Sequence, residues 1–338
     1  MSGEKVGNDE ELANEDSEYG ETRAKRPKSP KQSTKNLPRS TQKLAGETLR
    51  AAEVIGGWLK DALQKPAEVQ AAAIYLLFYH LSKLKTLTIY MPEDNDFLTE
   101  TMKSKFGPRL TNPNVPPALA NVKSVVVFGQ DERPNSRWHR LLHSLPFFLL
   151  PRVNSIQYYG NYYPEEQPAY EEYFAPYEGR GMIESLTLDV EVKGPALSTI
   201  LKVCDPSSLR QLNWLVPCDN NDVDEIDFAA AFAPISSSLT SLTISTSDWK
   251  SNLGCNVVAL LPSLTALEDL RLSEHLLFNS GSYDKSRVKL PPVLQHLRLE
   301  IWDILEWEWE YMEDDIVNLV RDNPWLKMIT LPLSLIHI

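Results

Sequence analysis

The chain has 338 residues, of which 42% are hydrophobic, so it is long enough to bury one large core or two ordinary ones. Its net charge of -12 argues against nucleic acid as the main ligand, because phosphate backbones bind basic surfaces. The chain has no apolar run long enough to span a membrane, and its first residues lack the apolar core of a secretory signal.

Residues 1–45 contain few large apolar side chains, so we expect a disordered tail. The charge of this tail is segregated, with eight acidic residues in 1–21 and eight basic residues but no acid in 23–43. Within the basic part, Ala24–Lys35 encloses Ser29, which precedes a proline. This pattern predicts either a nuclear import signal that phosphorylation of Ser29 weakens, or a solvated basic tail.

Residues 46–81 predict a helical N-terminal cap. Two apolar stretches with helical periodicity meet at Pro66, and proline suits the first position of a helix better than its interior.

Residues 82–338 are dominated by a repeated spacing, LxxLxL, in which other apolar residues replace some of the leucines. Its nine copies begin at Leu84, Val122, Val153, Ile183, Leu209, Leu239, Leu267, Leu294 and Leu326. A single copy is weak evidence, but nine copies at a nearly constant period indicate a stacked repeat. Asp314–Leu331 shows the plan of one unit, which is a short amphipathic helix, an Asn-Pro turn and a strand.

These repeats resemble leucine-rich repeats, and more narrowly the long, irregular repeats of fungal F-box and leucine-rich-repeat proteins. The resemblance covers roughly Ala71 to Leu331, and no F-box pattern precedes the repeats. It implies an α/β solenoid with parallel strands on its concave side and helices on its convex side. By family analogy it also implies substrate recognition for a ubiquitin ligase, whose scaffold subunits would then be partners.

Side chains alternate between the two faces of a strand, so the repeated leucines are expected in the core and the intervening residues on the concave surface. The last intervening position places Tyr90, Phe128 and Tyr159 on adjacent strands, which makes these aromatic rings candidates for partner binding. The favoured alternative is that the tyrosine-rich loop Gly160–Gly181 covers these rings within the chain. The other candidate partner-binding residues of this surface are Asp189, Arg271, His296, Arg298 and Glu300, and Ser273 is expected to face the same way.

Three further motifs have a chemical and a structural interpretation. His139 and His143 have the spacing of a metal-binding pair but lack a third ligand, which favours an ordinary helix face. Asp219–Asp227 resembles a calcium loop without its glycine and closing glutamate, which favours a solvated acidic loop. Glu306–Asp315 alternates acids with aromatics, and packing of the aromatics is favoured over an exposed recognition patch.

The three cysteines, Cys204, Cys218 and Cys255, are widely spaced, which favours reduced and buried thiols in an intracellular protein. The chain contains no enzyme motif, so we expect no catalytic residue, cofactor or metal. The sequence therefore predicts a non-catalytic protein-protein interaction module in the nucleus, the cytoplasm or both, which binds neither nucleic acid nor membrane. The alternative is a nuclear regulatory or structural scaffold unrelated to ubiquitin.

Overall fold

The computed structural model describes most of the repeat region and part of the N-terminal cap. The described residues are 57–65, 69–81, 83–90, 119–128, 141–160, 171–172, 174–190, 192, 194–216, 228–246, 254–277, 288–300 and 306–331. All of them belong to Ala51–Ile338, the larger of two compact units of the chain. The predicted tail, including Ser29, lies outside the described residues.

Two helices lie in the stretch for which we predicted a cap, α2 (Gly57–Ala62) and α3 (Val69–His80). α3 is apolar on all sides, and it buries Tyr75 and Phe78 but leaves Leu77 58% exposed. The ring of Phe78 packs edge to face on Phe147, with 6.4 Å between the ring centroids. This contact ties α3 to η2 (Leu141–Leu149), the first helical segment among the described residues of the repeats.

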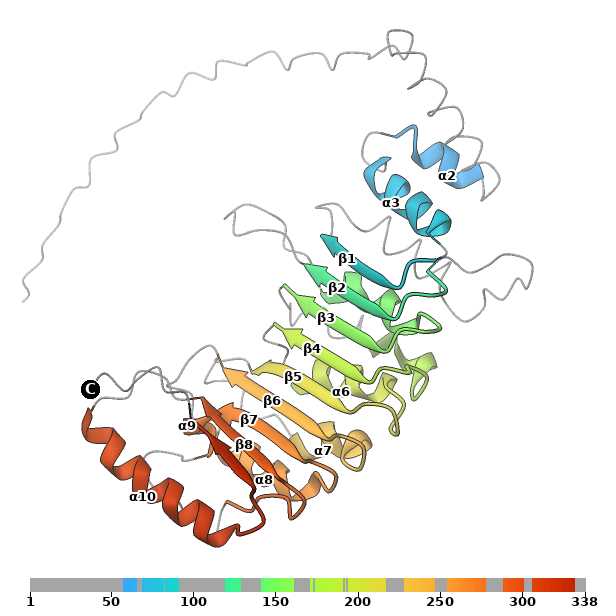
Figure 1. Ribbon diagram of the computed structural model, residues 1–338. Coiled ribbons are helices and arrows are strands. Elements are labelled where there is room, and N and C mark those ends of the chain that lie inside the picture. The colour runs from blue at the N-terminus through green and yellow to red at the C-terminus, as the bar shows by residue number, and fades with distance from the viewer. Residues whose placement is uncertain are drawn as a thin grey trace, which may run out of the picture. The chain divides into compact units, whose positions relative to one another are not determined.

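The repeats form one nine-stranded parallel sheet in which each strand lies beside its neighbours in the sequence (Figure 1). The strands are β1 (Thr86–Tyr90), β2 (Ser124–Phe128), β3 (Ser155–Tyr159), β4 (Ser185–Asp189), β5 (Gln211–Val216), β6 (Ser241–Thr246), β7 (Asp269–Ser273), β8 (His296–Glu300) and β9 (Met328–Thr330). Each predicted copy of the repeat contributes one strand, which begins at the third residue of the copy. The predicted fold class, an α/β protein resembling leucine-rich repeats, is thereby confirmed.

A single type of turn leads into most of the strands. The N–H of Leu84 donates to the carbonyl of Leu81, and the same bond across three residues recurs before β2, β3, β7, β8 and β9. Pro151, Pro292 and Pro324 each occupy the second position of such a turn, where the fixed φ of proline is favourable. The prolines that precede the strands therefore shape the turn rather than only end the helix.

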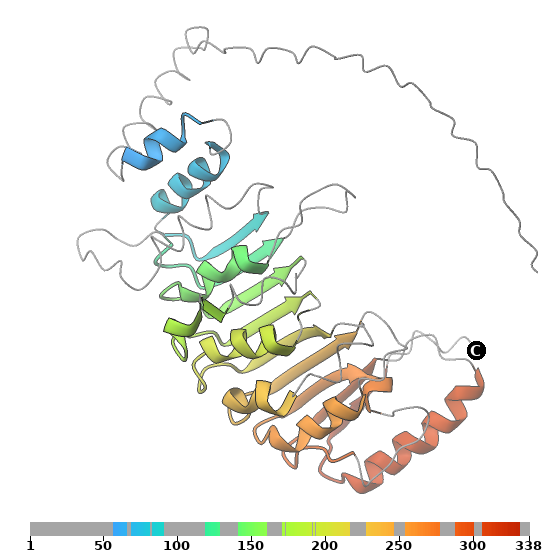
Figure 2. The ribbon, with the colours of Figure 1, turned by 180° about the vertical axis from the view of Figure 1, so that it is seen from behind.

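Helical segments connect the strands and lie on one side of the sheet, as Figure 2 shows. They are η2 (Leu141–Leu149), η4 (Ala175–Tyr177), α6 (Gly194–Val203), α7 (Phe228–Phe232), η6 (Ala233–Ile235), α8 (Gly254–Leu260), η7 (Leu261–Ser263), α9 (Glu274–Leu277) and α10 (Glu306–Asp322). α7 contacts both α6 and α8, so successive repeats also stack through their helices. This is the arrangement of strands and helices that the sequence predicted for one repeat unit.

The core lies between the sheet and these helices. The second and fourth residues of the inner strands are buried, for example Leu186 and Leu188 of β4, and among the described residues Trp214 is the largest fully buried side chain. At the last repeat this burial is less complete, because Ile329 and Leu331 are only half-buried. A repeat in the middle of the stack is covered on both sides, whereas β9 pairs only with β8 among the described strands.

Candidate functional site

The alternate strand residues that point away from the helices form a continuous surface, which we call the ladder face. In β1, Thr86, Thr88 and Tyr90 are exposed while the two residues between them are buried. The same alternation runs through β2 to β8, and neighbouring strands are paired without a shift in register. Side chains at equivalent positions therefore form columns across the sheet.

Ser273 is an exception, and its predicted place on the ladder face is wrong. Its side chain is fully buried, and within the described part of the chain its hydroxyl has no hydrogen-bond partner. β7 ends at Ser273 and α9 begins at the next residue, so the chain leaves the sheet at this point. The alternation of faces ends where the strand ends.

Tyr90, Phe128 and Tyr159 form a stack of three rings, which we call the aromatic column. They lie in register on β1, β2 and β3, and the centroids of neighbouring rings are 4.9 Å and 5.0 Å apart. The planes of neighbouring rings differ by 16° and 14°. This spacing matches the distance of about 4.8 Å between neighbouring strands, so the backbone pairing places the rings face to face.

The members of the aromatic column differ in exposure. Phe128 and Tyr159 are half-buried, whereas Tyr90 is 66% exposed. The hydroxyl of Tyr159 donates to Oε1 of Gln157, 3.3 Å away on the same strand. Tyr90 thus offers the largest aromatic surface of the column to a partner.

The loop that we considered as a cover for these rings runs from Gly160 to Gly181. Its residues 161–170 lie outside the described part of the chain, so the prediction that they cover the rings stays a prediction. Near its other end, Phe174 is buried and packs edge to face on Phe148, with 5.6 Å between the ring centroids. Because Phe148 belongs to η2, this part of the loop packs on the helical side of the sheet.

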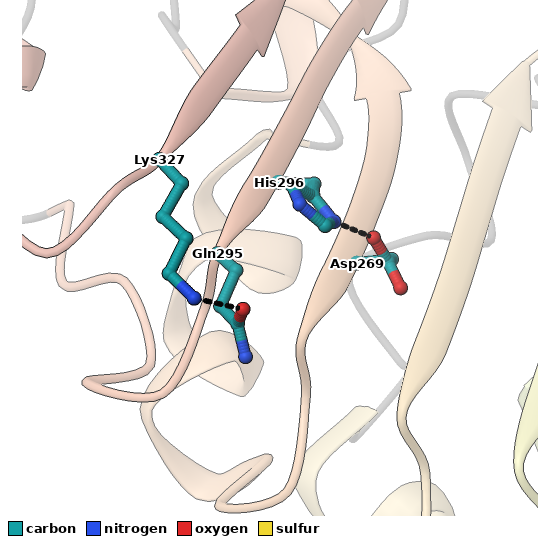
Figure 3. A network of polar contacts seen from close by, with 4 residues as sticks. All are labelled: Asp269, Gln295, His296 and Lys327. Atoms are coloured by element: carbon teal, nitrogen blue, oxygen red, sulfur yellow. Dashed lines mark hydrogen bonds and ion pairs between the residues drawn. The ribbon is translucent and has the colours of Figure 1, made fainter.

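Five residues at the other end of the ladder face form what we call the charged cluster. They are Asp269 and Arg271 on β7 and His296, Arg298 and Glu300 on β8. Nδ1 of His296 contacts the carboxylate of Asp269 directly across the two strands (Figure 3). Arg271 forms a diagonal ion pair with Glu300, in which Nε donates to Oε1 at 2.5 Å.

Arg298 has a different environment from the other members of the charged cluster. It is exposed and lies in register with Arg271, so the two arginine side chains start from neighbouring positions on the ladder face. Both carboxylates of the cluster contact other side chains, and Arg298 has no hydrogen-bond or ion-pair partner among the residues that the structure describes. Its positive charge is therefore available on the ladder face.

The strands between these two features carry small polar side chains. Asn213 on β5 donates through Nδ2 to Oγ1 of Thr187 on β4, at 3.2 Å. Asp189 is exposed and lies in register with Tyr159, which places a negative charge beside the aromatic column. The structure thus places all eight predicted partner-binding residues on one face, in two groups rather than one.

Sequence reasoning missed the residues that directly precede the strands. Nζ of Lys327 donates to Oε1 of Gln295 at 2.7 Å, and Figure 3 shows this pair where β8 and β9 begin. The equivalent side chains of two earlier repeats, Asn154 and Glu184, are 3.5 Å apart from Nδ2 to Oε2. These polar residues all stand one position before a predicted strand, and that regularity was the signal in the sequence.

The motifs with alternative interpretations contribute little here. The structure does not describe His139, the side chain of His143, the acidic stretch 219–227, or the side chains of Trp307, Trp309 and Tyr311. Across the ranges that are described, no three His, Cys, Asp or Glu side chains gather to hold a metal ion. None of the helices in those ranges is long and apolar enough to cross a membrane.

Cys204 is a free and fully buried thiol, as the sequence predicted. Burial away from water raises its pKa to about 12, although a backbone hydrogen bond opposes this shift. At neutral pH the side chain is therefore a thiol rather than a reactive thiolate.

The chain matches no protein-family model, and no curated protein matches its sequence. The fold and the geometry of the ladder face therefore carry the functional argument.

Proposed function

We propose that this protein is a non-catalytic interaction module that holds a partner protein on its ladder face. The observation that carries this proposal is the aromatic column, whose outermost residue, Tyr90, is 66% exposed on a regular sheet surface. A single exposed apolar side chain is common on protein surfaces, whereas a contiguous patch of large exposed side chains, such as a stack of aromatic rings, marks a contact surface for another protein.

The rest of the ladder face also suits a protein ligand. It combines stacked aromatic rings, small hydroxyl and amide side chains, and two arginines, and tyrosine and arginine are enriched at protein interfaces. The charges of both signs at β7 and β8 would orient a partner rather than bind it without selectivity.

The resemblance of the repeats to those of F-box and leucine-rich-repeat proteins supports a finer proposal. In it, the bound partner is a substrate delivered to a ubiquitin ligase, and the chain also associates with the scaffold subunits of that ligase. A nuclear scaffold role is the competing proposal, and it requires a partner on the ladder face without those subunits.

Affinity capture with two matched variants tests the proposal. Tyr90→Ser removes an exposed ring from the ladder face, whereas Met182→Ser removes a side chain of similar exposure, 58%, from outside the strands. Proteins captured by the wild-type chain and by Met182→Ser, but at least tenfold depleted with Tyr90→Ser, are the expected partners. Each variant must also unfold within a few degrees of the wild type, because a misfolded chain would lose partners for another reason.

Two results decide between the alternatives. Recovery of ubiquitin-ligase scaffold subunits with both the wild type and Tyr90→Ser supports substrate recognition, since those subunits would bind elsewhere. If Tyr90→Ser and Met182→Ser capture the same proteins as the wild type, the ladder face is not the binding surface and the proposal is wrong.

A further inference from the structure

The last repeat leaves one end of the stack open. Among the described strands β9 pairs only with β8, and α10, the helix that leads into β9, lies at the same end (Figure 1). Leu297 and Leu299 on β8 are at most 1% exposed, whereas Ile329 and Leu331, their equivalents in the ninth repeat, are half-buried. Described residues therefore cover the ninth layer of the core on one side only.

α10 carries exposed apolar residues beside its buried side. Leu319 is fully buried and Ile316 is half-buried, so these two residues mark the side that faces the core. Val317 is 47% exposed and Val320 is 43% exposed, and Val320 lies one helical turn from both Ile316 and Val317. The opposite flank of the helix carries polar residues that are half-buried, namely Asp315, Asn318 and Asp322. The valine flank is thus the more open of the two.

The charges beside these valines are complementary to themselves. Glu313 and Arg321 are exposed and stand four residues before and four residues after Val317, so all three lie along one side of the helix. In two antiparallel copies of α10 centred on Val317, Glu313 of each copy lies opposite Arg321 of the other. A parallel copy would instead bring like charges together. The pattern therefore fits a second α10 that runs in the opposite direction.

Two neighbouring groups also bear on this charge pairing. Asp314 is exposed next to Glu313, so it adds to the attraction for the Arg321 of an antiparallel copy. Arg321 donates from Nη1 to Oδ1 of Asn318, 3.1 Å away, and this bond uses one of its five N–H donors. The guanidinium group can therefore also donate to a carboxylate of the second copy.

The edge of β9 fits the same arrangement. The N–H of Met328 donates to the carbonyl of Gln295, which directly precedes β8. Successive N–H groups of a strand point to opposite sides, so the N–H of Ile329 is directed to the open edge. Such an edge pairs readily with another strand. A two-fold axis perpendicular to the sheet would make both β9 strands and both α10 helices antiparallel, with the helices on one side of the joined sheet.

We propose that two copies of this chain associate through an end face, which consists of Glu313, Val317, Val320 and Arg321 on α10 together with the edge of β9. The contact is self-complementary, as a two-fold interface requires. A helix of about 25 Å and one short strand make a small interface for each copy, so we expect association in the micromolar range. This inference does not depend on the ladder face or on its partner.

Reciprocal charge changes test the proposal. Sedimentation velocity of the full-length chain between about 1 and about 200 µM should show a monomer that becomes a dimer. Glu313→Arg and Arg321→Glu each place like charges together at both contacts, and each should weaken the dimer about tenfold or more. In an equal mixture of the two variants every contact again joins opposite charges, so dimers should return. The double variant should dimerise alone for the same reason.

Changes outside the end face provide the matched controls. Val317→Ser should weaken the dimer about tenfold, whereas Met182→Ser, which removes an apolar side chain of similar exposure elsewhere, should not. Lys202→Glu alters the net charge as much as Arg321→Glu does, but on α6, and should leave the dimer unchanged. Thermal unfolding of each variant at about 1 µM, where the monomer is expected, excludes a loss of fold.

The strand contact has its own test. Ile329→Pro removes an N–H that points to the open edge, so it should prevent dimerisation and keep the bond between Met328 and Gln295. Ile329→Ala is the control, because it also shortens the side chain but keeps the N–H. A dimer that Ile329→Pro leaves as strong as Ile329→Ala does would exclude pairing of the β9 strands.

Several results would overturn the inference. A wild-type chain that stays monomeric at about 200 µM excludes the dimer. A dimer that the single charge changes do not weaken, or that their mixture does not restore, uses another surface. A dimer that forms only after deletion of residues 332–338 would assign the end face to that segment of the same chain. None of these results would alter partner capture through Tyr90, so the proposed function is tested separately.

Discussion

The indole Nε1 of Trp214 donates a hydrogen bond to the carbonyl oxygen of Val192, 3.2 Å away, and thereby joins the fifth strand to the segment that follows the fourth. The indole is 1% exposed and packs on the ring of Phe232, with 6.2 Å between the ring centroids. One side chain therefore links the sheet, the preceding repeat and the helix α7.

Trp214→Phe should destabilise the protein by about 2–3 kcal/mol, because it leaves a buried carbonyl without a donor and removes part of a buried ring. Trp325→Phe provides the matched control, since that indole also donates to a carbonyl of the preceding repeat, Pro291 at 3.1 Å, but is 40% exposed. We expect the control to cost less than about 1 kcal/mol, because water can replace the lost bond. Urea unfolding followed by circular dichroism measures both values, and equal losses would show that burial at Trp214 is not the cause.

The thiol of Cys204 should make stability depend on pH above neutrality. Its pKa rises from 9.0 to about 12 in the folded protein, so the folded state holds this proton more tightly than the unfolded state does. The stabilising contribution is complete below pH 9 and is lost as the pH rises from 9 towards 12, with a slope of about 1.4 kcal/mol per pH unit. Denaturant unfolding of the wild type and of Cys204→Ala over this range isolates the contribution, because lysines and tyrosines titrate in both. Identical pH profiles for the two proteins would contradict the prediction.

The same thiol should also resist chemical labelling. In a chain with Cys218→Ser and Cys255→Ser, Cys204 is the remaining cysteine, and a maleimide at pH 8 should modify it only after unfolding in urea. Modification of the folded chain at the rate of the unfolded one would show that the thiol is accessible.

The aromatic column should stabilise the sheet in addition to offering a surface. Stacked aromatic pairs contribute about 0.5–1.5 kcal/mol beyond the area that they bury, so a coupling of that size is expected between Tyr90 and Phe128. A double-mutant cycle with Tyr90→Leu and Phe128→Leu measures it from unfolding free energies. A cycle between Tyr90 and Tyr159, which both stack on Phe128 but lie two strands apart, is the control and should give a smaller value.

Much of the architecture could be predicted because it depends on local spacing. Each LxxLxL copy places its apolar residues on one face of a strand. A single repeat cannot bury this face alone, so nine similar copies are expected to stack on one another and share a core. The same alternation predicted that Tyr90 and Arg298 would lie on the ladder face. It failed at Ser273, because the start of a helix directly after this residue ends the alternation, and the repeat spacing carries no signal for that change.

The pairings within the candidate site were less predictable. Sequence spacing places Arg271 and Arg298 in one column, but it does not determine which of them forms an ion pair with Glu300. The ion-pair partner of Glu300 depends on whether an arginine on the neighbouring strand lies diagonally opposite and is long enough to contact its carboxylate. This geometry exists only after the strands are paired. Because Glu300 pairs with Arg271, Arg298 has no ion-pair partner among the described residues.

The sequence by itself determined the number of strands, their order and, except at Ser273, the face that the candidate side chains occupy, because these follow from a period of two within a strand and a repeat of about thirty residues along the chain. Only the tertiary structure decided that three rings stack at about 5 Å, that Trp214 bonds to the preceding repeat, and that Arg298 is left without a described partner. Those relationships join residues far apart in the sequence, 22 positions for Trp214 and Val192 and 38 for Tyr90 and Phe128, and they depend on the packing of side chains whose neighbours the repeat pattern does not specify.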